Sequence, residues 1–537
     1  MNPIVVVGSG PSGVHFSLSV LKKGHEVLML DVGMAKPPVL HPQDSFSELK
    51  QNLVDPVEYF LGREFESVIY PGSTGEYYGF PPNKRYVFDQ PDQFDHHSQG
   101  LTPLTSFAQG GLAEAWTAGV YPFREEELVD FPFSYQEIRP HYDEVSARIG
   151  ISGTTDDLSR FYPMQKQVLD ALELDEHSQE LLNQYEGKKR ILNSQLRCYL
   201  GRARLAVLSR DQDGRQACSY RGRCLWGCPN GAFYTPSLTL DQCKQYDTFR
   251  YIPGSYVTHF KVGPGKRITH ICAESIDTKE SQSYRVGTLV LASGTFSTSR
   301  IVLDSIRIHT GKTLTLSGLM DNQQILVPFV NIKMIGRSLN NERYQYHQLA
   351  LGIEGECPKE YIHALITTLK SSLFHPLIQR IPSDLKTAMF VFRQIHPALG
   401  LVNVNLHDTR RRENTVTIEP SEGKDPSKLM INYVVDQNRQ AKIYEAIHRV
   451  KKVLWQLGCV VPPGMVHIRP MGASVHYAGT LPMSTEEMPL TVSKDCRSHD
   501  FDNLYVVDGA TFPFLPAKNI TFSLMANAVR VAETAFS

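Results

Sequence analysis

The chain has little cysteine, no long apolar run and no excess of charge of either sign, and each of these absences excludes a class of protein. Nine cysteines among 537 residues are too few for a secreted fold held together by disulfides. No uninterrupted apolar stretch approaches the ~20 residues that a membrane-spanning helix needs. Lys and Arg together number 55 and Asp and Glu 56. A charge balance this close to zero does not favour a nucleic-acid backbone or an anionic membrane as the partner.

No basic leader precedes the first apolar strand, which is expected to begin at Ile4, so no secretory signal is visible. We therefore expect a cytoplasmic, reducing setting, without a transmembrane segment. Repeats of fixed period are absent too. At roughly 100–200 residues per domain, the length suggests three domains or two elaborate ones.

Strand-like and helix-like segments alternate along the chain. Residues 3–33 have the pattern strand, turn, helix, strand, and the tail, residues 465–537, returns to strand, turn and helix. Between them, helices are expected at residues 140–149 and 163–174, among others. Alternation of this kind predicts an α/β or α+β fold whose first domain is split in the sequence.

The N-terminal segment has the pattern of a dinucleotide-binding unit. The β-branched strand Ile4-Val5-Val6-Val7 runs into Gly8-Ser9-Gly10-Pro11-Ser12-Gly13, which is the G-x-G-x-x-G pattern. Its glycines allow a tight turn, close approach of a pyrophosphate and close packing of helix on strand. The next strand ends in Asp31, an acid placed to accept hydrogen bonds from ribose hydroxyls. The unit predicts nucleotide binding but does not distinguish FAD from NAD.

Four further segments carry a resemblance to a known family. The stretch Gly110-Gly111-Leu112-Ala113-Glu114-Ala115-Trp116 forms a second Gly-rich segment, and near the C-terminus stand His476-Tyr477-Ala478-Gly479-Thr480 and Asn503-Leu504-Tyr505-Val506-Val507-Asp508-Gly509. Ala517-Lys518-Asn519-Ile520-Thr521 follows, with Ile520 where the family has proline. In this order the motifs resemble those of the glucose–methanol–choline (GMC) oxidoreductases, in particular a bacterial alcohol and sugar dehydrogenase-like subgroup.

The resemblance implies FAD as the cofactor and assigns residues to it. Beyond the first glycine loop and Asp31, the implied contacts are Gly110, Gly111, Trp116, Val257, Asp508, Gly509, Asn519, Ile520 and Thr521. Some family members link FAD covalently through a histidine at the position of Ala115. Because alanine cannot form that link, we expect FAD to be bound non-covalently.

His476 is the candidate general base. An alcohol releases hydride only as its O–H proton is lost, and a neutral imidazole is suited to take that proton near pH 7. The family pairs this histidine with a second His or Asn, which here is Asn519 and would hydrogen-bond the substrate oxygen. Residues 520–535 are nearly all apolar and predict a buried helix. Asn519 would then sit at its N-cap, so a purely capping role stays open.

Three cysteines lie close together in the pattern Cys218-x5-Cys224-x3-Cys228. In some sugar-oxidising family members, cysteines of closely similar spacing hold a three-iron four-sulfur cluster. Buried structural thiols, an iron–sulfur cluster and a zinc site with a fourth ligand all stay open. Structural thiols are favoured.

The expected architecture is a discontinuous Rossmann-like FAD-binding domain with a second α+β domain on an antiparallel sheet. Residues 1–45, 100–125, 200–325 and 465–537 are assigned to the first; residues 46–99, 126–199 and 326–464 to substrate binding and covering elements. The expected activity is oxidation of a primary or secondary alcohol, such as a sugar, amino sugar or other polyol, to an aldehyde or ketone by hydride transfer to flavin N5. Oxygen or an electron-transfer partner would accept the electrons. A lyase of the same fold, with FAD but no net redox chemistry, is the alternative.

Overall fold

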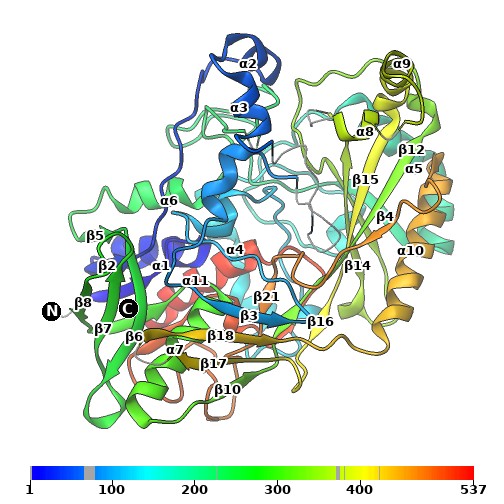
Figure 1. Ribbon diagram of the computed structural model, residues 1–537. Helices are drawn as coiled ribbons and strands as arrows, with labels where there is room; N and C mark the ends of the chain where they lie inside the picture. Colours follow the sequence, from blue (N-terminus) through cyan, green and yellow to red (C-terminus); the bar gives the residue numbers. More distant parts are fainter. Residues whose placement is uncertain are drawn as a thin grey trace.

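The structure is a computed structural model that describes residues 3–65, 76, 79–224, 226–370, 375–379, 381–421 and 424–536. Two sheets dominate it: a parallel sheet near both chain ends, and an antiparallel sheet from the middle of the chain (Figure 1). The expected mixed α/β class is confirmed. None of the described helices is long and apolar enough to cross a bilayer.

The parallel sheet has the strand order β22-β9-β1-β2-β5. Its central strand reads Ile-Val-Val-Val and is buried throughout, as expected for a strand with neighbours on both sides and helices on both faces. The register pairs Ile4 with Val27 on one side and with Thr288 on the other. The strands are β1 (Ile4–Val7), β2 (Val27–Leu30), β5 (Phe249–Ile252), β9 (Thr288–Leu291) and β22 (Leu504–Val506).

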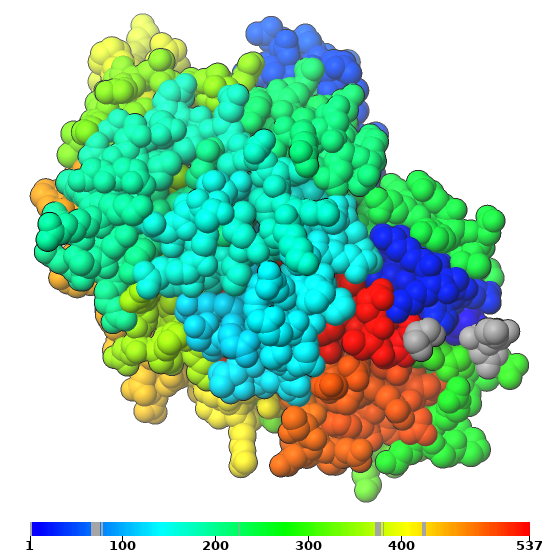
Figure 2. All heavy atoms as spheres, turned by 180° about the vertical axis from the view of Figure 1, so that it is seen from behind, coloured from blue at the N-terminus to red at the C-terminus, as the bar shows by residue number. Residues whose placement is uncertain are grey.

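Helices from distant parts of the sequence cover this sheet. The first and last helices pack on each other, and Lys23 Nζ donates to the Ala532 carbonyl at 3.0 Å. Figure 2 shows the N-terminal and C-terminal segments side by side on the back of the molecule. The helices around this sheet are α1 (Pro11–Lys22), α4 (Tyr135–Ile149), α6 (Pro236–Cys243), α7 (Thr295–Thr310) and α11 (Thr521–Ala535).

The antiparallel sheet has the order β19-β12-β15-β14-β13-β4, with β20 pairing β12. Along β12, Ile325, Val327 and Phe329 belong to a core with helices α5 and α10. Alternation then turns Gln324 and Leu326 to the other face, where both line the main cavity. The elements are β4 (Cys198–Arg202), β12 (Gln323–Asn331), β13 (Leu349–Ile353), β14 (Ile362–Thr368), β15 (Leu399–Leu406), β19 (Cys459–Val460), β20 (His467–Ile468), α5 (Glu176–Gln195) and α10 (Arg439–Gln456).

Smaller sheets and helices surround these two. One of these sheets has the order β10-β17-β18-β3 and packs against α7. In the sequence, its β17–β18 hairpin lies between β15 of the antiparallel sheet and α10. The remaining strands are β3 (His96–Gln99), β6 (Ser255–Val262), β7 (Ile268–Ser275), β8 (Ser281–Arg285), β10 (Thr315–Ser317), β11 (Met320–Asp321), β16 (Asp408–Thr409), β17 (Thr415–Ser421), β18 (Lys424–Asn432), β21 (Tyr477–Ala478) and β23 (Phe514–Leu515). The remaining helices are α2 (Phe46–Asn52), α3 (Pro56–Leu61), α8 (His375–Gln379) and α9 (Leu385–Ile395).

One expected helix is wrong. Residues 163–174 are irregular, and the Leu169 amide bonds to the Ile151 carbonyl at 2.7 Å instead of to a helical neighbour. The helix begins only after Asp175, whose carboxylate accepts from the Ser178 amide at 2.6 Å as an N-cap. Tertiary pairing therefore overrides the weak helical pattern there.

Candidate active site

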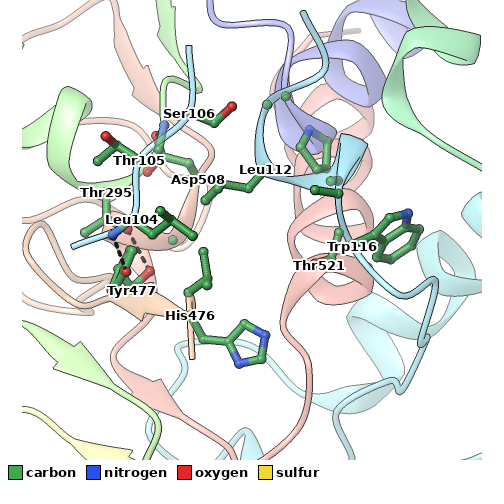
Figure 3. A pocket seen from close by; sticks show the side chains of 18 of the residues that line it. Leu104, Thr105, Ser106, Leu112, Trp116, Thr295, His476, Tyr477, Asp508 and Thr521 are labelled. Carbon is green, nitrogen blue, oxygen red and sulfur yellow. Dashed lines mark hydrogen bonds between the residues drawn. The ribbon is translucent and has the colours of Figure 1, made fainter. Parts of the chain in front are cut away.

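A cavity of about 520 Å³ reaches from the first glycine loop to the antiparallel sheet. It brings together residues of every motif assigned above to cofactor or catalysis, from both ends of the chain. Figure 3 shows Trp116 and Thr521 on one side of it, His476 below, and Leu104, Thr105 and Ser106 opposite. The cysteine motif lies elsewhere.

The first glycine loop is shaped for close approach. Gly8 has φ of +98°, and a Cβ on Gly13 would lie 2.0 Å from the Gly8 carbonyl oxygen, so a side chain at either position is excluded. Helix α1 follows with Gly10 at its N-cap and no side chain capping it. The unpaired N–H groups and the positive dipole of its first turn make an anion site. These residues fit the pyrophosphate of a dinucleotide.

Asp31 lies at the cavity wall just after β2. Its carboxylate accepts from the Ser9 hydroxyl and, at 3.0 Å, from the Tyr251 hydroxyl. Burial raises its pKa to about 6, against these hydrogen bonds, which lower it. The Ser9 Oγ also accepts from the Gly110 amide at 2.9 Å. Ser9 thus joins the two Gly-rich segments that the sequence assigned to one cofactor.

The second Gly-rich segment forms another wall. Gly110 and Gly111 both have positive φ, +91° and +64°, a region that favours glycine. The indole of Trp116 is fixed by donation to the Tyr234 carbonyl at 2.9 Å. Ala115 also lines the cavity, so the position that carries a linking histidine in some family members holds a methyl group.

Asp508 and Gly509 follow β22 at its carboxyl end. The Asp508 carboxylate accepts from the Gly294 amide at 2.9 Å and from the Thr298 hydroxyl at 2.5 Å, which ties the start of α7 to this turn. Burial raises the pKa of Asp508 to about 6. A Cβ on Gly509 would lie 2.4 Å from the Tyr477 carbonyl oxygen. Val257, on β6, lines the cavity as well, and its carbonyl accepts from Arg300.

His476 projects from a tight loop into the cavity. Its backbone amide donates to the Ser474 hydroxyl at 2.9 Å, and Nδ1 lies 3.0 Å from Oδ1 of Asn322. The preceding residue, Val475, has φ of +64°, a strained value for a β-branched residue that costs of order 1–3 kcal/mol. Burial lowers the pKa of His476 to about 4. The imidazole is therefore neutral near pH 7 and able to accept a proton.

Asn519 lines the same cavity as His476. It is not the N-cap of the last helix: α11 begins at Thr521, Ile520 occupies the N-cap position, and no side chain caps it. The purely capping role is therefore wrong. The Asn519 Oδ1 is buried without a hydrogen-bond partner among the described residues, a costly state unless a ligand supplies one. Ile520 and Thr521 line the cavity beside it.

Sequence reasoning missed the side of the cavity formed by the antiparallel sheet. Gln324, Leu326, His347, Leu365, Leu401 and Asn403 line it. Burial lowers the pKa of His347 to about 4, and its Nδ1 lies 2.7 Å from the Thr367 hydroxyl. The period-2 alternation of residues 323–331 could have identified one face of that strand. No local pattern marks the partners of His476.

The three cysteines of the Cys218 motif line a separate cavity of about 30 Å³. Burial raises the pKa of Cys218 to about 11 and that of Cys224 further, so both are protonated thiols near pH 7. Cys224 Sγ accepts from the Gln345 amide and Cys228 Sγ from the Phe233 amide. In the part of the chain that the structure describes, no group of three or more His, Cys, Asp or Glu side chains is arranged to hold a metal ion. The arrangement gives the iron–sulfur and zinc interpretations no support.

Comparison with known proteins agrees with this geometry. The sequence model of the family described as GMC oxidoreductase matches residues 410–528. The chain is 23% identical to 2-methyl-1,2-propanediol dehydrogenase of Mycolicibacterium austroafricanum, over 99% of this chain and 94% of that protein. It is 21% identical to the fructose dehydrogenase large subunit of Gluconobacter japonicus, over 99% and 97%.

A likeness in structure extends over the whole chain. A formate oxidase of Aspergillus oryzae, solved in a study of FAD modification, superposes with a TM-score of 0.61 at 10% identity, covering 99% of this chain and 97% of that one. At that identity the likeness shows the fold alone. The family match over the C-terminal part and the two full-length relatives make the chain similar to the GMC oxidoreductases, in agreement with the resemblance that its sequence motifs carry.

Proposed function

We propose that the protein oxidises a primary or secondary alcohol carbon of a sugar, amino sugar or other polyol to an aldehyde or ketone. One observation carries the proposal: a single cavity is lined both by the first glycine loop, at Gly8 and Gly10, and by the pair His476 and Asn519. Two full-length relatives are named for oxidation of a diol and of a sugar. The antiparallel-sheet wall adds the amides of Gln324 and Asn403, which suit hydroxyl groups.

His476 is the general base in this mechanism. The neutral imidazole accepts the proton of the substrate O–H as the C–H bond breaks, so the alkoxide electrons form the new C=O bond. The substrate loses one proton and one hydride, and the product is the carbonyl compound. Asn519 hydrogen-bonds the reacting oxygen and aligns it, which would supply the missing partner of its Oδ1.

FAD, when bound, supplies the hydride acceptor at flavin N5. The first glycine loop would hold its pyrophosphate, Asp31 the ribose, and the Val257 backbone the adenine. Gly110, Gly111, Trp116, Asp508, Gly509, Ile520 and Thr521 would surround the flavin end. Because Ala115 cannot form a covalent link, the cofactor is held non-covalently. The FAD-binding part is assigned as in the sequence, with residues 1–45, 100–125, 200–325 and 465–537.

The test is reduction of the bound flavin under anaerobic conditions. Purified protein is expected to be yellow, and acid precipitation should release free FAD. A panel of diols, sugars and amino sugars is then mixed with it in the absence of oxygen, and loss of the flavin absorbance is followed. Bleaching by a polyol supports the proposal. Conversion of a substrate while the flavin stays oxidised would instead identify a lyase.

A matched variant tests the role of His476. His476→Ala is expected to retain FAD and to lose at least ~10²-fold in the rate of flavin reduction, the usual scale for removal of a general base. An unchanged reduction rate in this variant would exclude His476 as the base. Reoxidation by oxygen or by an electron-transfer partner is then compared by adding air or an artificial one-electron acceptor.

A further inference from the structure

Asn322 follows β11 directly and contacts the ring of His476 across a long stretch of sequence. Its side chain is 1% exposed. Nδ2 donates to the Leu406 carbonyl at 2.9 Å and to the Pro516 carbonyl at 3.0 Å. An amide nitrogen has two hydrogens and no acceptor, so both are used here. The opposite orientation of the amide would place Oδ1 against two carbonyl oxygens. These two contacts therefore fix Oδ1 as the atom that faces His476.

This orientation decides the tautomer of the base. Oδ1 of Asn322 can only accept, so the 3.0 Å contact with Nδ1 of His476 requires a hydrogen on Nδ1. In the neutral imidazole the other nitrogen, Nε2, then has the free lone pair. We propose that Asn322 is a positioning residue that locks His476 as the Nδ1–H tautomer and so makes Nε2 the atom that takes the substrate proton. The proposal rests on the proposed role of His476.

Hydrogen bonds hold the backbone around Asn322 and His476 and so fix the distance between the two side chains. Asp321 precedes Asn322, and its carboxylate accepts from the Ser474 hydroxyl and from the Gly472 amide. That same Ser474 hydroxyl accepts from the His476 amide. Strand β11 also pairs with β21, with Asp321 opposite Tyr477. Asn322 and His476 therefore lie on adjacent segments joined by hydrogen bonds, which favours a single orientation of the His476 ring.

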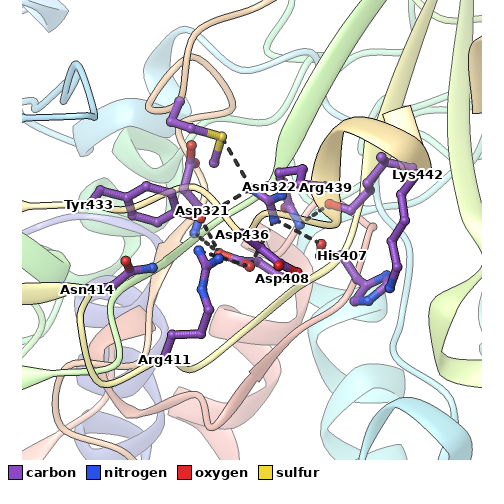
Figure 4. Close-up of polar contacts among 12 residues, drawn as sticks. Asp321, Asn322, His407, Asp408, Arg411, Asn414, Tyr433, Asp436, Arg439 and Lys442 are labelled. Atoms are coloured by element: carbon purple, nitrogen blue, oxygen red, sulfur yellow. Dashed lines mark hydrogen bonds and ion pairs between the residues drawn. The ribbon is translucent and has the colours of Figure 1, made fainter. Parts of the chain in front are cut away.

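Charged groups surround this pair, but the contact itself is between neutral groups. Figure 4 shows Asp321 and Asn322 beside Asp408 and Arg439. Arg439 donates to Asp408 at 2.9 Å, and the Tyr433 hydroxyl donates to Asp408 at 2.6 Å. On the other side, burial keeps the pKa of His363 well below its usual value, with Lys518 and His476 as further neighbours that lower it. A neutral acceptor such as Asn322 fixes the hydrogen without stabilising the imidazolium, which a carboxylate at the same place would do.

The direct test needs no substrate and no variant at Asn322. Protein labelled with ¹⁵N-histidine is studied by NMR at pH 7, and the His476 signals are assigned by their loss in His476→Asn. The lock predicts a protonated, pyrrole-type Nδ1 and an unprotonated, pyridine-type Nε2. The reverse assignment overturns the proposal. Because this reading does not depend on alcohol oxidation, it remains decisive even if no alcohol reduces the flavin.

Two substitutions test the consequence for the reaction. Asn322→Leu keeps the shape but removes the acceptor; it is expected to show Nε2–H signal and to lose at least about 10-fold in the rate of flavin reduction, as for other partners that orient a catalytic histidine. Asn322→Asp is unsuitable as a rescue, because its second oxygen would face the Leu406 and Pro516 carbonyls and its charge would stabilise the imidazolium. Asn503→Leu, which also removes a buried amide, therefore serves as the second substitution. A rate within about 2-fold of the wild type in Asn322→Leu, or an unchanged tautomer of His476 in that variant, overturns the proposal.

Asn503 is the matched control. Like Asn322, its side-chain amide makes three hydrogen bonds. Nδ2 donates to the carbonyls of Ile268 and Gly287, and Oδ1 accepts from the Ile268 backbone amide instead of from a histidine ring. Asn503→Leu should lower stability without changing the tautomer of His476. A change of the His476 tautomer in Asn503→Leu would show that loss of any buried amide changes the histidine signals, whether or not that amide contacts His476. This result would overturn the proposal.

Discussion

At the scale of the residue, burial decides which groups can act as bases. Among the residues that the structure describes, no charged group offsets the burial of His476, so the ring loses hydration and its pKa falls to about 4. Asp31 and Asp508 respond in the opposite sense, with pKa values raised to about 6, because burial disfavours whichever form is charged. The same physical cause therefore favours the neutral base and weakens the ionisation of the acids that line the cavity.

The pH dependence of the reductive half-reaction follows from His476. The base must be unprotonated, so the rate rises with pH through its pKa and is flat above it. With a pKa near 4, we expect the rate of flavin reduction under limiting substrate to be level from about pH 6 to pH 8. An ordinary histidine would instead give half the maximal rate near its usual pKa of ~6.5. Stopped-flow measurement of flavin bleaching against pH distinguishes the two, and a rise centred near pH 6.5 contradicts the prediction.

Asp31 should govern cofactor retention without affecting the chemistry. Asp31→Ala removes the acceptor of the Ser9 and Tyr251 hydroxyls and, in the proposed site, the acceptor of the ribose hydroxyls. We expect at least about 10-fold weaker FAD binding, corresponding to roughly 1.4 kcal/mol. Asp31→Asn keeps one acceptor oxygen and should be intermediate. FAD content after gel filtration measures both; equal FAD retention in all three proteins would contradict the assignment.

At the scale of the element, the segments that sequence predicted well are those with a strong period or a fixed chemical requirement. Strand β1 and the glycine loop are such a case, because no side chain fits at Gly13. The apolar pattern places the start of α11 one residue too early, which makes Asn519 the N-cap, whereas in the structure Ile520 occupies that position. Asn322 had no local signal at all: its importance comes from a ring that follows more than a hundred residues later and from two carbonyls in other strands and loops.

Helix α5 offers a test of local stability away from the site. Gly187 lies in its exposed middle, and a Cβ there would meet no atom within 4 Å. Gly187→Ala should therefore stabilise the protein by about 1 kcal/mol, because glycine lowers helix stability by that amount relative to alanine. Gly13→Ala is the contrasting variant and should lose FAD, since its Cβ would lie 2.0 Å from a carbonyl oxygen. Denaturant unfolding measures the first effect; a loss of stability in Gly187→Ala would contradict it.

At the scale of the whole molecule, buried histidines dominate the response to acid. In each of them burial lowers the folded-state pKa, so the unfolded chain binds a proton that the folded chain does not bind as the pH falls below ~6.5. Buried aspartates with raised pKa values oppose this, because they take up protons in the folded state between about pH 7 and pH 4. The histidines are His15, His177, His347, His363, His407 and His476, with the half-buried His96, His141 and His396; the aspartates are Asp31, Asp156, Asp321 and Asp508, and Glu127 responds as they do.

Because the histidines outnumber the aspartates in that comparison, unfolding takes up protons between pH 4 and pH 6.5 and stability falls as the pH is lowered through this window. The melting temperature of the FAD-loaded protein is therefore expected to be lower at pH 5.5 than at pH 7.5. Differential scanning calorimetry at constant ionic strength measures it. A melting temperature that rises on acidification would mean that the aspartates dominate.

The packing of α1 on α11 also bears on how the protein is made. The loop at Gly8 is synthesised well before His476, the edge strand β22 and α11. At about 5–20 residues per second, synthesis of the residues between Gly8 and the end of α11 takes roughly half a minute to two minutes. Throughout that time the cradle lacks its last strand and covering helix. A prematurely terminated chain therefore lacks His476 and has an incomplete cavity. Such a chain cannot reduce a bound flavin by the proposed reaction.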